Sequence, residues 1–176
     1  MGQNWEDRAQ YCVVCGAALE ERQAFGAVRK ACTRCDYIQF RSPATASAAV
    51  VARGREVLLV KRGIEPYLGC WGFPAGFQDY HESPEEALIR EVAEETGLTV
   101  QIVRLLDLCY TLDDPRKRSN VAVYLATAVA GTLCAADDAA DAAFFSLDEL
   151  PEPIAFQNNQ LILQRLLRDF PTGDIE

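Results

Sequence analysis

The chain has 176 residues, of which 49% are hydrophobic, and a formal net charge of −9 at pH 7. This length accommodates one compact domain plus a small appendage, and the apolar fraction is that of an ordinary globular protein. The acidic balance makes nucleic acid an unlikely partner, because backbone binding needs Lys and Arg to neutralise phosphates. The chain has no apolar run of about 18 residues that could span a membrane, and its polar, acidic N-terminus is unlike a signal peptide. We therefore expect a soluble, cytoplasmic protein.

Four of the seven cysteines form two Cys-x-x-Cys pairs near the N-terminus. In a chain without an export signal, such pairs indicate a metal site before they indicate disulfides. Two tight turns can surround one ion with four thiolates, which leaves no open coordination position and is typical of structural zinc. We predict a leader over residues 1–10 and a zinc ribbon over residues 11–40, with zinc bound by Cys12, Cys15, Cys32 and Cys35.

The ribbon segment is too short to build its own core, so metal would supply most of its folding free energy. The alternative is a redox role for one Cys-x-x-Cys pair. The segment is also locally basic, which leaves open a contact with nucleic acid or a partner protein; its basic residues are Arg22, Arg29, Lys30 and Arg34.

The larger domain is expected over residues 41–176, with the junction near Pro43. Two strands are predicted at 44–53 and 56–61, the second because its apolar run is continuous, as in a strand buried on both faces. An aromatic, glycine-rich loop follows at 63–77. We expect Trp71 and Phe73 in this loop to pack in the core.

Two residues around this loop are candidate substrate contacts. Arg62 ends the second predicted strand, and Arg suits bidentate recognition of phosphate. Tyr67 lies in a loop that could position a planar base or a phosphate.

A helix with clear start and stop signals follows the loop. Ser83 is a good N-cap, Pro84 fits the first helical position and Glu86 completes a capping box, whereas Gly97 suits a left-handed C-terminal cap. The apolar stripe of this helix is expected to hold Leu88, Ile89 and Val92.

Glu91, Glu94 and Glu95 have the i, i+3, i+4 spacing, so the three carboxylates share one face of this helix. They repel one another, and near the C-terminus they oppose the helix dipole. A hard divalent cation such as Mg²⁺ or Mn²⁺ would remove the conflict. The alternative is an ordinary solvated acidic face.

The remaining pattern predicts two strands, at 100–110 and 121–129, and then a loop at 131–143 that carries Asp138. A short strand begins at Phe144, and a second capping box, Ser146 to Glu149, opens a helical turn that stops near Pro151. An amphipathic helix is predicted at 156–170. Strands interleaved with a central and a terminal helix indicate an α+β fold in which helices flank a mixed sheet.

The segment from residue 76 to residue 98 resembles the Nudix box, whose fixed positions are filled by Gly76, Glu82, Arg90, Glu91, Val92, Glu94, Glu95, Gly97 and Leu98. The resemblance implies an α/β/α sandwich and a hydrolase that cleaves a nucleoside diphosphate linked to another group. It also implies that Mg²⁺ or Mn²⁺ is bound by the backbone carbonyl of Gly76 and the carboxylates of Glu91, Glu94 and Glu95. In this family Glu82 and Arg90 orient the helix and its carboxylates, and many members form homodimers.

The implied hydrolysis requires a carboxylate that accepts a proton from the attacking water. In relatives it comes from the box or from a later loop, so Glu94 and Asp138 are the two candidates. We expect the catalytic groups to be Glu94, Glu95, Asp138 and Arg90.

A four-cysteine ribbon before a Nudix box resembles the ADP-ribose/FAD pyrophosphatases of plant plastids and, more distantly, the NADH pyrophosphatases. The Ser-Gln-Pro-Trp motif of the NADH group is absent, and Pro115 lies near a position where ADP-ribose hydrolases often carry proline. We expect hydrolysis of ADP-ribose or FAD with release of AMP. The alternatives are an NADH or nucleoside triphosphate pyrophosphatase, and a non-catalytic nucleotide sensor that contacts nucleic acid or protein.

Overall fold

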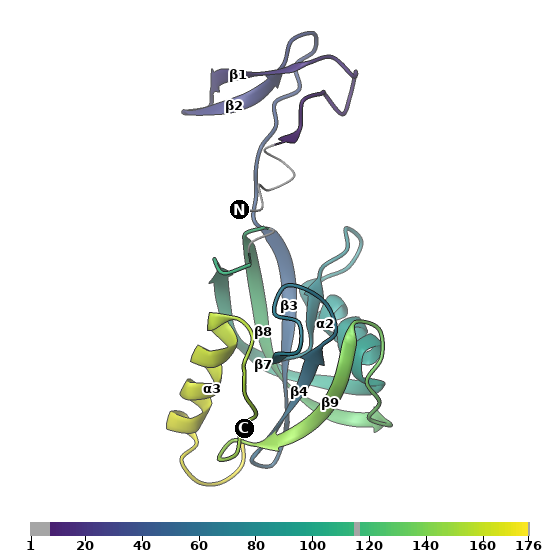
Figure 1. Cartoon of the computed structure of the whole chain (residues 1–176), viewed down its shortest axis with the longest axis vertical. Coiled ribbons are helices and arrows are strands. Elements are labelled where there is room, and N and C mark those ends of the chain that lie inside the picture. Colours follow the sequence, from purple (N-terminus) through teal and green to yellow (C-terminus); the bar gives the residue numbers. More distant parts are fainter. Residues whose placement is uncertain (1–7, 115–116, 176) are drawn as a thin grey trace. The chain divides into compact units, whose positions relative to one another are not determined.

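The computed structural model describes residues 8–114 and 117–175 (Figure 1). These residues form two compact units, one of residues 8–43 with Lys117 and one of residues 44–114 with residues 118–175. Most of the predicted leader, and the expectation placed on Pro115, lie outside the described residues. No helix in the described part of the chain is long and apolar enough to cross a membrane.

The small unit is built on one hairpin, in which β1 (Leu19–Ala24) pairs antiparallel with β2 (Ala27–Cys32). Phe25 and Gly26 form the two-residue turn with φ of 49° and 77°, as the primed turns of tight hairpins require. Among the described residues of this unit, the buried hydrophobic side chains are those of Cys12, Ala31 and Cys32. So few buried side chains cannot supply a hydrophobic core, and two of the three belong to the cysteine cluster.

The large unit contains a seven-stranded mixed sheet within the described residues. Its main path runs β5-β4-β3-β8-β7, with β6 paired to β3 and β9 paired to β4. The pairing of β3 with β8 is parallel and the other pairings are antiparallel. The strands are β3 (Ala44–Arg53), β4 (Glu56–Arg62), β5 (Trp71–Gly72), β6 (Ala75–Phe77), β7 (Leu98–Thr111), β8 (Ser119–Gly131) and β9 (Ala139–Ser146).

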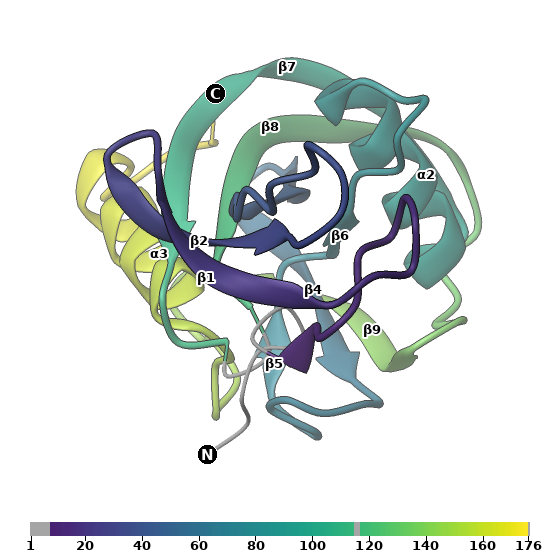
Figure 2. The same cartoon turned by 90° about the horizontal axis from the view of Figure 1, so that it is seen from above.

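Two helices cover opposite faces of this sheet, α2 (Pro84–Thr96) and α3 (Gln157–Asp169), as Figures 1 and 2 show. Alternate side chains of a strand point to opposite faces, so Val50 packs in the cluster beneath α3 and Val51 in the cluster beneath α2. The expected α/β/α sandwich with a mixed sheet is confirmed.

The long strands confirm the patterns that predicted them. Val57, Leu58 and Leu59 are fully buried, as expected for a strand covered on both faces. Trp71 and Phe73 are 9% and 4% exposed, so their expected place in the core is also confirmed.

Three local predictions were wrong. First, β9 begins at Ala139 rather than at Phe144, because the backbone of Asp141 pairs with Lys61 on β4 and this pairing draws an alanine-rich segment into the sheet. Second, the predicted helical turn at Ser146 is a hydrogen-bonded turn, in which Glu149 N–H donates to the Ser146 carbonyl at 3.0 Å. Third, Ile89 is 39% exposed rather than buried, because the outer flank of α2 carries it away from the sheet.

The loop at 63–77 contributes two short strands that residue patterns did not predict. β3 pairs with β4 only through Ala52 and Arg53, and β6 takes the place of β4 beside residues 46–48. This pairing sets Gly76 opposite Ser47. The Ser47 hydroxyl donates to the Pro84 carbonyl at 2.7 Å, which ties the first turn of α2 to the same point of the sheet.

Candidate active site

Two caps fix where α2 begins and ends. Ser83 N–H donates to Glu86 Oε2 at 2.7 Å, and Glu86 N–H donates to Ser83 Oγ at 3.2 Å, so the predicted capping box is confirmed. Gly97 closes the helix in the left-handed conformation with φ 68°, which glycine adopts without the strain of a side chain. Because both ends are set, the rotation of the helix and the direction of its three glutamates are set as well.

Arg90 is the centre of a charged network on α2. Its guanidinium donates to Glu82 at 2.6 Å and 3.1 Å, to Glu91 at 2.8 Å, to Glu94 at 2.9 Å and to the Phe77 carbonyl at 3.1 Å. Arginine offers five N–H donors in a rigid plane, which suits such a set of acceptors. The hydrogen bonds from Arg90, together with one from the Asp79 backbone, lower the pKa of Glu82 to about 2. Arg90 thus joins the loop before α2 to two of the predicted metal ligands.

Gly76 lies against the carboxylate of Glu91. A Cβ added to Gly76 would overlap the Glu91 carboxyl group, so any side chain at this position requires that carboxyl group to move. The neighbouring Ala75 N–H donates to Glu95 Oε2 at 3.0 Å. The backbone of the glycine loop is therefore in direct contact with two carboxylates of α2.

Glu95 is a buried acidic residue, with only 4% of its surface exposed. Burial, followed by the adjacent Asp138 carboxyl group, raises the pKa of Glu95 to about 9. Burial also raises the pKa of Glu91, although its hydrogen bond with Arg90 opposes the rise. Three acidic side chains from two segments thus crowd a shielded place where their negative charges are unfavourable.

The loop that carries Asp138 is held to the end of α2 and to β4. Ala136 N–H donates to the Glu95 carbonyl at 3.0 Å, and Gly63 N–H donates to the Asp138 carbonyl at 2.7 Å. These two bonds position Asp138 beside Glu95. Carboxylate and carbonyl oxygens are the ligands that hard divalent cations prefer, so this donor set fits Mg²⁺ or Mn²⁺.

Two other predicted site residues, Arg62 and Tyr67, pack against the ring of Phe156. The Arg62 guanidinium lies over the ring of Phe156, 5.2 Å from its centroid, and donates to the Pro66 carbonyl at 2.7 Å. The Tyr67 ring lies 4.7 Å from that of Phe156, and its hydroxyl donates to the Asp113 carbonyl at 3.3 Å. Glu94 is half exposed and is held by Arg90.

Phe156 and Asp113 lie against Tyr67, a contact that no helix or strand pattern predicts. Both are distant in sequence from Tyr67. Their positions follow from the way the terminal helix and β7 pack beside the loop at 63–70, which no local pattern encodes.

The four cysteines predicted to bind zinc form a cluster whose sulfur atoms all lie within 4.8 Å of one another. The Sγ atoms of Cys12 and Cys35 are 3.7 Å apart, and those of Cys15 and Cys32 are 3.4 Å apart. A tetrahedral zinc–thiolate site places its sulfur atoms about 3.8 Å apart. The Arg34 N–H also donates to Cys32 Sγ at 3.3 Å, so the geometry and the donor set fit zinc.

The sandwich, with residues 76–98 folded as a glycine loop and a capped acidic helix, defines a class of hydrolases. Residues 42–166 match the NUDIX domain, and the chain belongs to the Nudix hydrolase family.

Three known proteins illustrate the likeness. The chain is 37% identical over 127 residues to an ADP-ribose pyrophosphatase of Methanocaldococcus jannaschii, covering 72% of this chain and 75% of that protein. It is 30% identical over 149 residues to an NAD-capped RNA hydrolase, NudC, of Pseudomonas fluorescens, which covers 84% of this chain but 51% of the relative. The chain therefore spans about half the length of that relative. A crystal structure of a NUDIX hydrolase from Nitrosomonas europaea superposes with a TM-score of 0.84 at 26% identity and covers 93% of both chains.

Proposed function

We propose that this protein hydrolyses the pyrophosphate bond of a nucleoside diphosphate derivative, most specifically ADP-ribose or FAD, and releases AMP. The observation that carries the proposal is the shielded acidic cluster of Glu91, Glu95 and Asp138 against Gly76. The similarity to an ADP-ribose pyrophosphatase over most of both chains supports the choice of substrate.

The residues that would bind Mg²⁺ or Mn²⁺ are Gly76, through its carbonyl, and Glu91, Glu94 and Glu95. A bound divalent cation neutralises phosphate charge and lowers the pKa of a coordinated water. Arg90 donates to the carboxylates of Glu91 and Glu94 and holds them in place. Glu82 holds Arg90 in turn, so the ligand geometry is set before substrate arrives.

In the proposed reaction the oxygen of water attacks one phosphorus, and the bridging phosphorus–oxygen bond breaks with its electrons on the departing phosphate. Asp138 and Glu94 are the candidates to accept the proton of the water. Asp138 is held beside Glu95 by two backbone hydrogen bonds of its loop, whereas Glu94 is half exposed and bonded to Arg90. Because these bonds hold its loop in place, Asp138 is the better candidate for the base that accepts the proton of the water. Arg62, which lies on Phe156, is proposed to contact a phosphate.

Residues 11–40 are proposed to be a ribbon with one structural zinc ion, and residues 41–176 to be the hydrolase domain. A cytoplasmic location and a homodimeric assembly complete the proposal. The residues of the acidic cluster all belong to the large unit, and none of them comes from the ribbon.

A substrate panel tests the proposal. Purified protein with Mg²⁺ or Mn²⁺ should release AMP from ADP-ribose or FAD faster than from NADH, and should convert nucleoside triphosphates least. No release of AMP from ADP-ribose or from FAD would refute it. Preferential turnover of NADH would favour the second candidate, an NADH pyrophosphatase; the similarity to an NAD-capped RNA hydrolase supports a substrate that contains an NAD group.

A further inference from the structure

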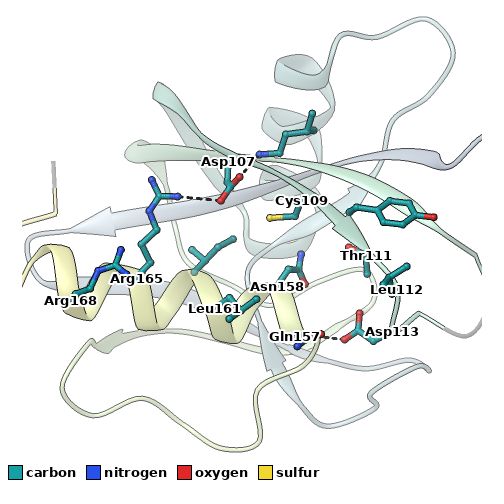
Figure 3. Close-up of a pocket in the computed structure, with 13 residues that line it drawn as sticks. Asp107, Cys109, Thr111, Leu112, Asp113, Gln157, Asn158, Leu161, Arg165 and Arg168 are labelled. Atoms are coloured by element: carbon teal, nitrogen blue, oxygen red, sulfur yellow. Dashed lines mark hydrogen bonds and ion pairs between the residues drawn. The ribbon is translucent and has the colours of Figure 1, made fainter.

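Two surfaces outside the acidic cluster take no part in the proposed reaction. One is a pocket of about 440 Å³ between the end of β7 and α3, with Thr111 buried in its wall (Figure 3). In this pocket Asp107 pairs with Arg165 at 3.2 Å. Asp113 accepts the Gln157 N–H at 2.7 Å, so the carboxylates of the pocket already have partners. The other surface lies on the hairpin of the small unit and carries two exposed aromatic rings beside two arginines.

These four side chains form a row across neighbouring segments of the small unit. Arg22 on β1 lies directly opposite Arg29 on β2, so the two side chains share one face of the hairpin. Phe40 comes from the segment that runs back along β2, and the Arg29 Cζ atom lies 4.9 Å from the centroid of its ring. The Phe25 ring follows, with its centroid 5.6 Å from that of Phe40. We call these residues the arginine–phenylalanine row.

The two arginines are placed unfavourably for the hairpin alone, because like charges directly opposite on paired strands repel. Arg22 donates to Glu20 at 2.8 Å, but both side chains of this ion pair are about half exposed, and such pairs contribute little. Arg29 donates to the Ala24 carbonyl at 3.2 Å. One carboxylate therefore lies beside two guanidinium groups, and an anionic partner would relieve their repulsion.

Phe25 is also placed unfavourably for the hairpin. It is the first residue of the tight turn and has φ 49°, a conformation that Asn and Gly adopt readily and bulky residues do not. Its side chain is nevertheless 76% exposed, and that of Phe40 is 57% exposed. A ring that strains the turn and remains open to solvent adds little to folding, so its presence indicates a contact with another molecule.

The distribution of charge indicates that this molecule is an anion. Residues 8–43 carry six Lys or Arg and three Asp or Glu, whereas residues 44–114 and 118–175 together carry nine and 20. The small unit would stay positive with the two negative charges that four thiolates around one Zn²⁺ add. The net charge of −9 conceals this difference. An anion is therefore attracted to the small unit and repelled by the large one.

Single-stranded nucleic acid combines the two chemistries that the row requires. Its phosphates pair with guanidinium groups, and its bases stack on aromatic rings and on arginine planes. A duplex keeps the faces of its bases stacked within the helix, where the rings of Phe25 and Phe40 do not reach them. An acidic peptide would pair with the arginines but would offer the two rings no planar partner.

We propose that the arginine–phenylalanine row binds single-stranded nucleic acid, with bases stacked on Phe25 and Phe40 and phosphates bound by Arg22 and Arg29. The proposal goes beyond hydrolysis by the large unit and does not depend on it.

The test is Phe25→Asn in the full, zinc-containing chain. Asn-Gly is the preferred pair for this turn, so the melting temperature and the zinc content should stay equal or rise while the ring is lost. Binding is measured by fluorescence anisotropy without added divalent metal, on labelled oligo(U) and oligo(dT) of about 12 nucleotides, a length typical of such surfaces. Both should bind more tightly than a duplex of equal length. Phe25→Asn should lower the affinity for both at least about fivefold, the effect of one lost stacking contact.

Val28→Thr is the matched control, because Val28 is an exposed residue on the opposite face of the same hairpin. It should change neither affinity nor melting temperature. Arg29→Gln tests the phosphate contact through its dependence on salt. Each phosphate contact on a single strand adds about 0.7 to the slope of log affinity against log salt, so the slope should become shallower by about 0.7 in this variant.

Poly-glutamate separates nucleic acid from an acidic protein as the partner. The wild type should bind it more weakly than oligo(U), and Phe25→Asn should bind it as the wild type does. Tighter binding of poly-glutamate than of either oligonucleotide would overturn the proposal in favour of an acidic protein partner. Equal affinity of the wild type and Phe25→Asn for oligo(U) and oligo(dT), or no binding of either, would also overturn it.

Discussion

Any side chain at Gly76 would enter the space of the Glu91 carboxyl group. Gly76→Ala should therefore push that carboxylate away and disturb the geometry of the cluster. A displacement of about 1 Å in an active site lowers rates on the order of 100-fold, and overpacking destabilises by about 1–3 kcal/mol. Rates of AMP release and urea unfolding measure the two effects.

The double variant Gly76→Ala/Glu91→Ala separates the effect on activity from the effect on stability. Glu91→Ala should restore much of the stability lost in Gly76→Ala, because it removes the overlapping carboxylate, but it should not restore activity. Equal stability of Gly76→Ala and the wild type would contradict the close approach of these two residues.

Glu82 provides a prediction about pH. Its pKa is lowered to about 2 by Arg90 and the Asp79 backbone, below the usual value near 4.3 of an unfolded chain. The pair therefore stabilises the fold fully above about pH 4.5, and this contribution is lost as pH falls toward 2. The free energy of unfolding of Glu82→Gln in urea should be smaller than that of the wild type at pH 6. The difference between the two proteins should shrink as the pH falls.

Glu149→Gln, on the exposed turn after β9, controls for the change in net charge. A difference between Glu82→Gln and the wild type that stays constant from pH 6 to pH 3 would rule out the ion pair as the cause.

At the residue scale, the sequence was informative wherever a local rule applied. Ser83, Glu86 and Gly97 were predictable as caps because capping depends on neighbours within a few positions. The burial of Thr111 was not predictable, because it depends on α3, a helix that begins at Gln157. Local chemistry identifies caps and metal ligands, whereas pocket walls depend on tertiary packing.

At the scale of elements, the ribbon hairpin depends on its four cysteines. In the described part of the small unit, few side chains are buried besides Cys12 and Cys32, so zinc should provide most of its folding free energy. The purified protein should carry one zinc ion per chain. Cys32→Ser should lose it, with greater protease sensitivity confined to residues 8–43.

Cys134→Ser, at an exposed cysteine, should keep the zinc and the protease resistance. The large unit should stay folded in both variants, because it has its own core. A Cys32→Ser protein with a full zinc content would show that the ribbon assignment is wrong.

The strands show where local patterns stop being informative. β4 was predictable because its apolar run is continuous and it is buried on both faces. β9 was predicted too short because its alanines have low strand preference, and pairing with β4 decides their conformation. β5 and β6 are two and three residues long, too short for any periodicity to appear.

At the scale of the whole molecule, the order of elements and the box resemblance together predicted the sandwich. The parallel pairing of β3 with β8 was not predictable from either strand, because it joins segments about 75 residues apart, such as Ala44 and Ser119. That pairing, with β6 on the other side of β3, places the glycine loop beside α2. The chemistry of the site is therefore encoded locally, and its assembly is encoded in long-range pairing.

We propose above all that the acidic cluster of Glu91, Glu95 and Asp138 supports hydrolysis of a pyrophosphate bond with a divalent cation. The most direct test compares wild type and Glu95→Gln for AMP release from ADP-ribose in the presence of Mg²⁺. Glutamine keeps the size of the side chain but is a poorer ligand for a hard cation. The wild type should release AMP and should release none after addition of EDTA. Glu95→Gln, with its fold intact, should be slower by about 100- to 1,000-fold, as expected when transition-state charge stabilisation is removed. Equal rates of AMP release by the two proteins would contradict it.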